Sequence, residues 1–107
     1  LCPEIPWVVQ AATQARFMGF RAIQLTALCV KYQELTVKWL KEHDVPSDGL
    51  YMRKLNDFRS DVEIKRDFIE QLLKVYDIKK AFDDKPDIVS LWEEYNIPCI
   101  RVYPGEV

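Results

Sequence analysis

The sequence has few of the residues on which metal-binding and disulfide-linked proteins depend. It contains one histidine, His43, and three cysteines that lie far apart, with no C-x-x-C spacing and no close pair of ligands. This composition disfavours both a zinc site and a disulfide framework. Because isolated thiols are typical of reducing compartments, we expect a cytoplasmic protein. No signal peptide is visible, and no apolar run approaches the roughly 20 residues of a membrane span, so we expect no membrane partner.

A strong charge of either sign is missing as well. The 15 basic and 17 acidic residues give a formal net charge of −2, which predicts no strong field for nucleic acid or anionic lipid. Apolar residues are plentiful instead: 49% of the chain is hydrophobic, enough for a packed core. The length fits one small domain over residues 1–107. Because the chain begins with Leu1 and not with methionine, we expect a segment of a longer domain.

Hydrophobic periodicity predicts four helices that alternate with four strands. The order is α-β-α-β-α-β-α-β, which implies an α/β fold with a mostly parallel sheet, right-handed crossovers and helices on both faces. Asp61 is a candidate N-cap of the third helix. The helices are predicted over 3–19, 31–43, 62–76 and 86–95, and the strands over 20–26, 50–53, 78–82 and 98–103.

Polar residues follow three of the predicted strands. Thr26 comes after "AIQL", Arg53 after "LYM", and the pair Asp83 and Asp84 after "KKAF". Parallel α/β sheets bind ligands outside the carboxyl ends of their strands. The convergence of these residues at strand ends is therefore the strongest indication of a functional site that the chain carries.

The adjacent carboxylates of Asp83 and Asp84 repel each other if both are ionised and unpaired. A divalent cation removes this conflict. Mg²⁺ prefers a few carboxylate oxygens and keeps several waters, which leaves room for a phosphate. The alternative is that one aspartate caps the helix that begins near Pro86 while the other is solvated.

The stretch "NDFRSDVEIK" adds further charges. Asp57, Arg59 and Asp61 alternate, and Lys65 follows on the apolar stripe of the predicted helix. A lysine on that stripe either extends its amine to the solvent or reaches a site where it holds an anion. The alternating charges are equally typical of an ordinary loop with weak local ion pairs, and Thr26 of an ordinary edge strand. Taken together, these residues describe a phosphate site.

Three stretches carry a characteristic combination of motifs. "AIQLTAL" is a strand ending in threonine, the run from Tyr32 to Lys65 holds T-x-x-W-L, "MR" and D-x-R-x-D before a lysine, and "AFDD" precedes a patterned helix and strand. From about residue 4 to residue 106, the chain resembles the haloacid dehalogenase (HAD) superfamily of phosphotransferases. More specifically, it resembles the 3′-phosphatase domain of phage-type polynucleotide kinases and related small phosphatases.

The resemblance implies a HAD-like fold, a Rossmann-like three-layer sandwich, and a phosphoryl transfer through an aspartyl-phosphate. In that family pattern, Thr26 would bond the phosphoryl oxygens, Lys65 would neutralise their charge and orient the nucleophile, and Asp83, helped by Asp84, would hold Mg²⁺. The substrate would be a phosphomonoester, with nucleic-acid 3′ ends as one candidate. The residues that would lie near the substrate mouth are Arg53, Asp57 and Arg59.

Two features depart from the family. The first motif, D-x-D-G-T, which supplies the nucleophile at the end of the central first strand, is absent from the sequence. Ala27 and Leu28 stand where the subfamily usually has glycine and a phosphate-binding arginine, and leucine cannot bind an anion. The expected sheet therefore lacks its first central strand.

A sheet without its central strand leaves main-chain groups unpaired, at a cost of roughly 1–3 kcal/mol each. Either the chain is a segment of a longer protein, or its two halves pair directly, or a homo-oligomer or partner supplies a strand. Three functions follow. The chain belongs to a Mg²⁺-dependent phosphatase, or it is an inactive pseudophosphatase that binds nucleotide, nucleic acid or protein, or it is an interaction domain completed by a partner strand.

Overall fold

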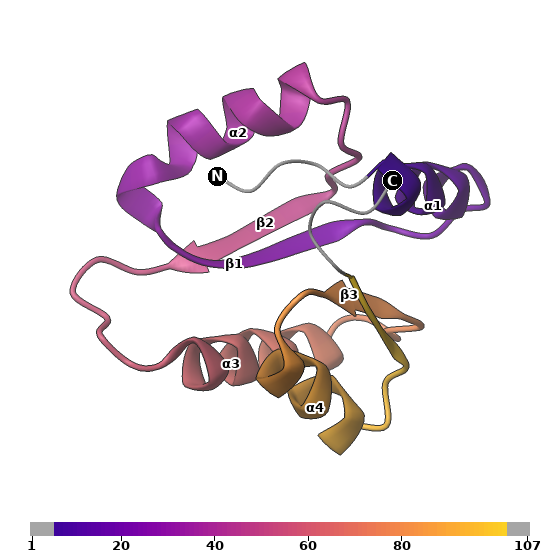
Figure 1. The fold of residues 1–107 in the computed structure, drawn as a ribbon. Coiled ribbons are helices and arrows are strands. Elements are labelled where there is room, and N and C mark those ends of the chain that lie inside the picture. Colours follow the sequence, from indigo (N-terminus) through magenta and orange to yellow (C-terminus); the bar gives the residue numbers. More distant parts are fainter. Residues whose placement is uncertain (1–5, 103–107) are drawn as a thin grey trace. The chain divides into compact units, whose positions relative to one another are not determined.

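The structure is a computed structural model that describes residues 6–102, with the side chains of its first helix described from residue 11 onward. Within this range, helices and strands alternate in the predicted order (Figure 1). No helix in 6–102 combines the length and the apolar character that crossing a membrane requires. The elements are α1 (Pro6–Phe17), β1 (Ile23–Cys29), the short 3₁₀ turn η1 (Val30–Tyr32), α2 (Gln33–Glu42), β2 (Gly49–Arg53), α3 (Asp61–Leu73), β3 (Ala81–Asp83), α4 (Pro86–Glu94) and β4 (Cys99–Arg101).

The strands form two parallel pairs, β1 with β2 and β3 with β4. Ile23 lies opposite Gly49 in the first pair, and Ala81 lies opposite Cys99 in the second. The prediction of an α/β chain with parallel strands is therefore confirmed. The chain divides into two compact units, a first that runs to Asp57 and a second that begins at Phe58.

The first unit contains α1, α2 and the longer strand pair (Figure 1). Gly19, with φ of +96°, lies in the turn after α1, where glycine avoids the strain that a side chain would cause. The buried side chains of α2 are Thr36 and Leu40, and β2 buries Met52. Thr36 satisfies its buried hydroxyl by donating to the carbonyl of Tyr32 at 3.0 Å.

The second unit has the better-buried core. Helices α3 and α4 pack against each other, and α4 also contacts β3 and β4. Phe68, Ile69 and Leu72 of the apolar stripe predicted for α3 are buried, as the 3–4 residue spacing requires, whereas Leu73 of the same stripe is exposed. The buried apolar residues of this unit are Ile64, Phe68, Ile69, Leu72, Ala81, Ile88, Leu91, Trp92, Ile97 and Val102.

The N-cap of α3 differs from the sequence-based expectation. The cap is Ser60, whose hydroxyl oxygen accepts a hydrogen bond from the N–H of Glu63 at 3.2 Å. Asp61 is instead the first helical residue, where its negative charge favours the positive end of the helix dipole. Both residue types satisfy the physical demand of a helix start, so the sequence alone did not separate them.

Ser60→Ala is expected to lower the free energy of unfolding by about 0.5–2 kcal/mol, because the N–H of Glu63 loses its capping acceptor. Urea denaturation followed by circular dichroism measures the change. Ser90→Ala is the matched control, since Ser90 is exposed within α4 and caps no helix. Equal stability of the Ser60 variant and the unsubstituted protein would contradict the capping role.

Candidate functional site

Lys65 and Asp83 form an ion pair at the carboxyl end of β3. Lys65 extends from α3, and its Nζ lies 2.9 Å from Oδ2 of Asp83, the last residue of the strand. Their side chains are only 12% and 10% exposed. A buried charge without a partner is strongly unfavourable, so each group stabilises the charge of the other. Of the two alternatives for Lys65, the structure therefore has its amine on a charged partner and not in the solvent.

The second oxygen of Asp83 is engaged as well. Its Oδ1 accepts a hydrogen bond from the main-chain N–H of Lys85 at 3.1 Å. Lys85 is the N-cap of α4, and no side chain caps that helix. The carboxylate of Asp83 thus fixes the turn between β3 and α4 without capping the helix itself. Asp84 is half-buried beside it, and its negative charge acts on the amine of Lys85.

Arg59 and Asp61 form ion pairs within the second unit. Lys85 Nζ donates to Asp61 at 2.7 Å, and this hydrogen bond is the main reason that the pKa of Lys85 is raised, against the opposing effect of burial. Arg59 is paired with Asp67. Both pairs are substantially exposed, so each contributes about 1 kcal/mol or less. These contacts match the ordinary charged-loop interpretation of the D-x-R-x-D stretch.

The sequence predicted that Thr26 ends its strand, and this prediction is wrong. β1 continues to Cys29, and its register against β2 shifts between Leu25 and Cys29. Thr26 is the first residue of the resulting bulge. Its Oγ1 accepts a hydrogen bond from the N–H of Leu28 at 3.1 Å. Because the hydroxyl oxygen serves as an acceptor here, its own proton can be donated to another group.

Arg53 ends β2 and reaches across to β1. Its Nε donates to the carbonyl of Ala27 at 2.8 Å, and its Nη1 donates to the carbonyl of Asp57 at 2.9 Å. Arg53 and Asp57, both predicted as substrate residues, are thus joined to each other. Sequence reasoning missed the carbonyl of Ala27, because a main-chain acceptor leaves no trace in residue identity.

The predicted site residues fall into two groups. Thr26, Arg53 and Asp57 belong to the first unit. Within it, Arg53 donates a hydrogen bond to the main-chain carbonyl of Asp57. The second unit brings Lys65 and Asp83 into direct contact, whereas Arg59 is paired with Asp67. Asp84 follows Asp83 in sequence.

The donor set partly fits Mg²⁺. Asp83 and Asp84 offer the hard carboxylate oxygens that this ion prefers. Among residues 6–102, however, no group of three or more histidine, cysteine, aspartate or glutamate side chains is placed to hold a metal. Mg²⁺ commonly retains waters and phosphate oxygens, so two carboxylates can form the protein part of such a site when other ligands complete the shell.

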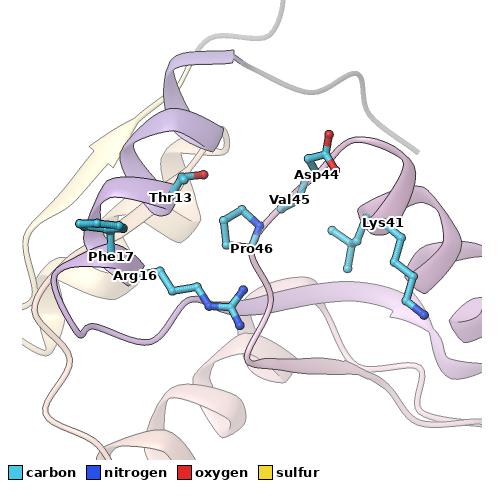
Figure 2. A pocket seen from close by; sticks show the side chains of 8 residues that line it. Thr13, Arg16, Phe17, Lys41, Asp44, Val45 and Pro46 are labelled. Atoms are coloured by element: carbon cyan, nitrogen blue, oxygen red, sulfur yellow. The ribbon is translucent and has the colours of Figure 1, made fainter.

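The first unit also contains an open groove of about 550 Å³, which the sequence did not predict. Figure 2 shows residues of α1 on one side and the turn after α2 on the other. Arg16 forms an ion pair with Asp48 at 3.1 Å, which links the end of α1 to that turn. The lining residues are Thr13, Arg16, Phe17, Leu40, Lys41, Asp44, Val45 and Pro46.

Cys99 lies next to the ion pair of Lys65 and Asp83. It is the first residue of β4 and is half-buried. Burial, followed by the negative charge of Asp83, raises the pKa of its thiol to about 11. At neutral pH the thiol is therefore protonated, and the sequence offered no signal for this environment.

The rate of alkylation of Cys99 is expected to rise with pH up to about 11, because the pKa of its thiol is raised to about 11 from an ordinary value of 9.0. At pH 8 the thiolate fraction of such a thiol is about 100-fold lower than that of a thiol with the ordinary pKa of 9.0. The higher nucleophilicity of the more basic thiolate offsets part of this difference, so the labelling rate should be about 10-fold lower than that of the ordinary thiol. The pH dependence of iodoacetamide labelling, followed by mass spectrometry of the Cys99 peptide, tests this. An inflection near pH 9 would contradict it.

The same raised pKa links Cys99 to stability. The folded state binds the thiol proton more tightly than the unfolded state does. This contribution to the free energy of unfolding is complete below about pH 9 and is lost as the pH rises towards 11.

Comparisons with known proteins agree with one another. The family described as "Polynucleotide kinase PNKP phosphatase domain" matches residues 8–107. A protein of Autographa californica nuclear polyhedrosis virus, named "Putative bifunctional polynucleotide kinase/RNA ligase", is 27% identical over 70 residues, which are 64% of this chain. Two solved structures, titled "Structure of the Pnkp1/Rnl/Hen1 RNA repair complex" and "Structure of Pnkp1/Rnl/Hen1 complex", contain chains that are 30% identical to this one, with TM-scores of 0.85 and 0.86.

This chain spans only part of each of these relatives. The aligned segment covers 10% of the viral protein, and 33% and 36% of the two solved chains, while it covers 94% and 95% of this chain in the two structures. The small α/β arrangement with short parallel strand pairs is therefore shared with part of a larger protein in both solved structures.

Proposed function

This chain belongs to the family of polynucleotide kinase phosphatase domains, and from that membership we propose that it takes part in the Mg²⁺-dependent hydrolysis of phosphomonoesters. We further propose the 3′ phosphate ends of polynucleotides as the substrate. The observation that carries the proposal is the ion pair of Lys65 and Asp83, which are 12% and 10% exposed at the end of β3. A cation and an anion held so close together, with little solvent, suit a site that binds an anionic group and a metal ion at once.

Each charged group then has a distinct role. The amine of Lys65 would bind and neutralise the phosphoryl oxygens. Asp83 and Asp84 would hold Mg²⁺, which when bound supplies positive charge to the phosphoryl group in the transition state. Lys85, whose pKa is raised mainly by its hydrogen bond to Asp61, places a further positive charge beside Asp84.

The first unit would contribute Thr26, whose hydroxyl proton can be donated to a phosphoryl oxygen while its oxygen holds the N–H of Leu28. Arg53, Asp57 and Arg59 are proposed to lie around the substrate mouth. In this proposal the chain forms part of a HAD-like, three-layer sandwich.

The nucleophile has to come from outside the sequence described here. The chain contains no D-x-D-G-T motif, which supplies the nucleophile in the family pattern. Hydrolysis therefore requires a carboxylate that another segment or another chain supplies. One of the two solved relatives is described as part of an RNA repair complex. We propose that this protein also works with other repair proteins, in the cytoplasm, with a homo-oligomer or partner strand as one way to complete the sheet.

The test is a phosphatase assay of the full-length protein. The substrates are a chromogenic phosphomonoester and a 3′-phosphorylated oligonucleotide, each with Mg²⁺ and with EDTA. Release of phosphate that depends on Mg²⁺ and prefers the 3′ end supports the proposal. A 5′-phosphorylated oligonucleotide of the same sequence is the control for the position of the phosphate. No Mg²⁺-dependent turnover of any of the three substrates would reject the enzymatic function.

A binding module without catalysis is the second candidate. It is favoured by Ala27 and Leu28, which replace the glycine and the arginine expected from the family pattern. In this case the protein would bind a 3′-phosphorylated oligonucleotide or a protein partner without turnover. Fluorescence anisotropy with a labelled oligonucleotide, run beside the phosphatase assay, separates the two candidates.

A further inference from the structure

The bulge of β1 creates a local problem of hydrogen bonding. Leu25 lies opposite Tyr51 and Cys29 lies opposite Arg53, so residues 26–28 of β1 face only Met52 of β2. Such a bulge takes main-chain N–H and C=O groups out of the strand ladder. Because residues 26–28 are half-buried, these groups need partners other than bulk water.

Two side chains supply partners for two of these groups. The hydroxyl oxygen of Thr26 accepts from the N–H of Leu28 at 3.1 Å, and Nε of Arg53 donates to the carbonyl of Ala27 at 2.8 Å. The same guanidinium donates through Nη1 to the carbonyl of Asp57 at 2.9 Å. One side chain therefore ties the bulge to the loop that follows β2.

We propose that Arg53 is a positioning residue, whose guanidinium holds the bulge in the shape that presents the Thr26 hydroxyl to a phosphoryl oxygen. The inference rests on the proposed function, because that function assigns Thr26 to the phosphate. If the peptide between Ala27 and Leu28 rotated, the N–H of Leu28 would leave Oγ1, and the hydroxyl would no longer be held in one orientation. Arg53 then acts through Thr26 and not as a direct phosphate ligand.

The chemistry of arginine allows the two roles to be separated. Guanidinium offers donors in a rigid, planar fork, and here two of them reach carbonyls on different segments. A lysine amine keeps the positive charge but cannot reproduce both bonds with the same geometry. Arg53→Lys thus removes the positioning role and retains the charge that direct phosphate binding would need.

The experiment uses the full-length protein and inorganic phosphate as the probe. Isothermal titration calorimetry gives the phosphate affinity of Arg53→Lys, Arg53→Met, Thr26→Val and the double variant Thr26→Val/Arg53→Met. Hydrogen-exchange mass spectrometry of peptides that span residues 24–29 reports on the N–H of Leu28. Lys54→Met is the matched control, because Lys54 is an exposed basic neighbour.

The expected result is a loss of phosphate affinity of about 10-fold in both Arg53 variants, with exchange in residues 24–29 about 10-fold faster. Lys54→Met should change neither quantity. In the double variant, the affinity should equal that of Thr26→Val alone, because residues that act through one another are not additive.

Wild-type affinity in Arg53→Lys, additive losses in the double variant, or unchanged exchange in Arg53→Met would each overturn the proposal. A different outcome separates it from the function on which it rests. If the unsubstituted protein neither binds inorganic phosphate nor hydrolyses phosphomonoesters, the proposed function fails, and the link from Arg53 to phosphate fails with it. The exchange data would then still report separately on whether the guanidinium holds the bulge.

Discussion

Asp83→Asn is expected to reduce Mg²⁺-dependent phosphatase turnover of the full-length protein by about 100- to 1,000-fold. The substitution keeps the size of the side chain but removes the negative charge that faces Lys65 at 2.9 Å. An amide binds Mg²⁺ far less well than a carboxylate. The charged amine of Lys65 would also lose its anionic partner in a site with little solvent. Turnover at saturating substrate, measured over a range of Mg²⁺ concentrations, tests the prediction.

Asp87→Asn is the control for this variant. Asp87 is an exposed aspartate in the first turn of α4, four residues from Asp83, and it forms no part of the proposed site. It should retain turnover close to that of the unsubstituted protein. Because the amide oxygen that the Asp83→Asn substitution introduces can still accept a hydrogen bond from Lys65, circular dichroism should show that this variant is folded. Turnover of that folded variant within tenfold of the unsubstituted protein would exclude Asp83 from the chemistry.

Leu72→Ala is expected to lower the free energy of unfolding by about 2–5 kcal/mol, the largest effect on stability that we predict. Leu72 lies on the inner face of α3 and is 4% exposed. Its truncation removes buried methyl groups and leaves a cavity between α3 and its neighbours, which the packed core can only partly close. Chemical denaturation monitored by tryptophan fluorescence is suitable, because Trp92 is buried in the same unit.

Leu73→Ala is a control of the same chemistry one position along the helix. Leu73 is 40% exposed, so the same truncation should cost less than about 1 kcal/mol. Because both variants make the same Leu→Ala change at neighbouring positions of α3, the difference between them reports mainly on burial. Equal losses in the two variants would show that the assigned inner face of α3 is wrong.

Much of the fold could be predicted from the sequence, because its signals are local. The spacing of apolar residues in α3 and α4 identified both helices and most of their buried faces, with Leu73 as an exposed exception. The turn residues separated the helices from the strands. The boundaries were less certain. The predicted strand 20–26 is β1 at Ile23–Cys29, since periodicity does not reveal a bulge, and the cap of α3 is Ser60 and not Asp61.

The candidate site was predictable as a set of residue types but not as a set of contacts. The proximity of Lys65 and Asp83 was expected from family resemblance, whereas the position of Cys99 beside them and the groove next to α1 were not. No sequence motif predicts either feature, because each depends on which segments of the chain pack together. The roles of Thr26, Arg53, Asp57, Arg59 and Asp84 stay predictions.

The amino-acid sequence alone determined the alternation of helices and strands, the parallel pairing and the family, because these depend on patterns over a few to a few tens of residues. Only the tertiary structure decided which polar groups meet. The bond from Lys65 to Asp83 joins residues 18 apart, and the bond from Arg53 to Ala27 joins residues 26 apart. Such contacts form because burial leaves charges and main-chain groups in need of partners, and the nearest partner is set by packing and not by order along the chain.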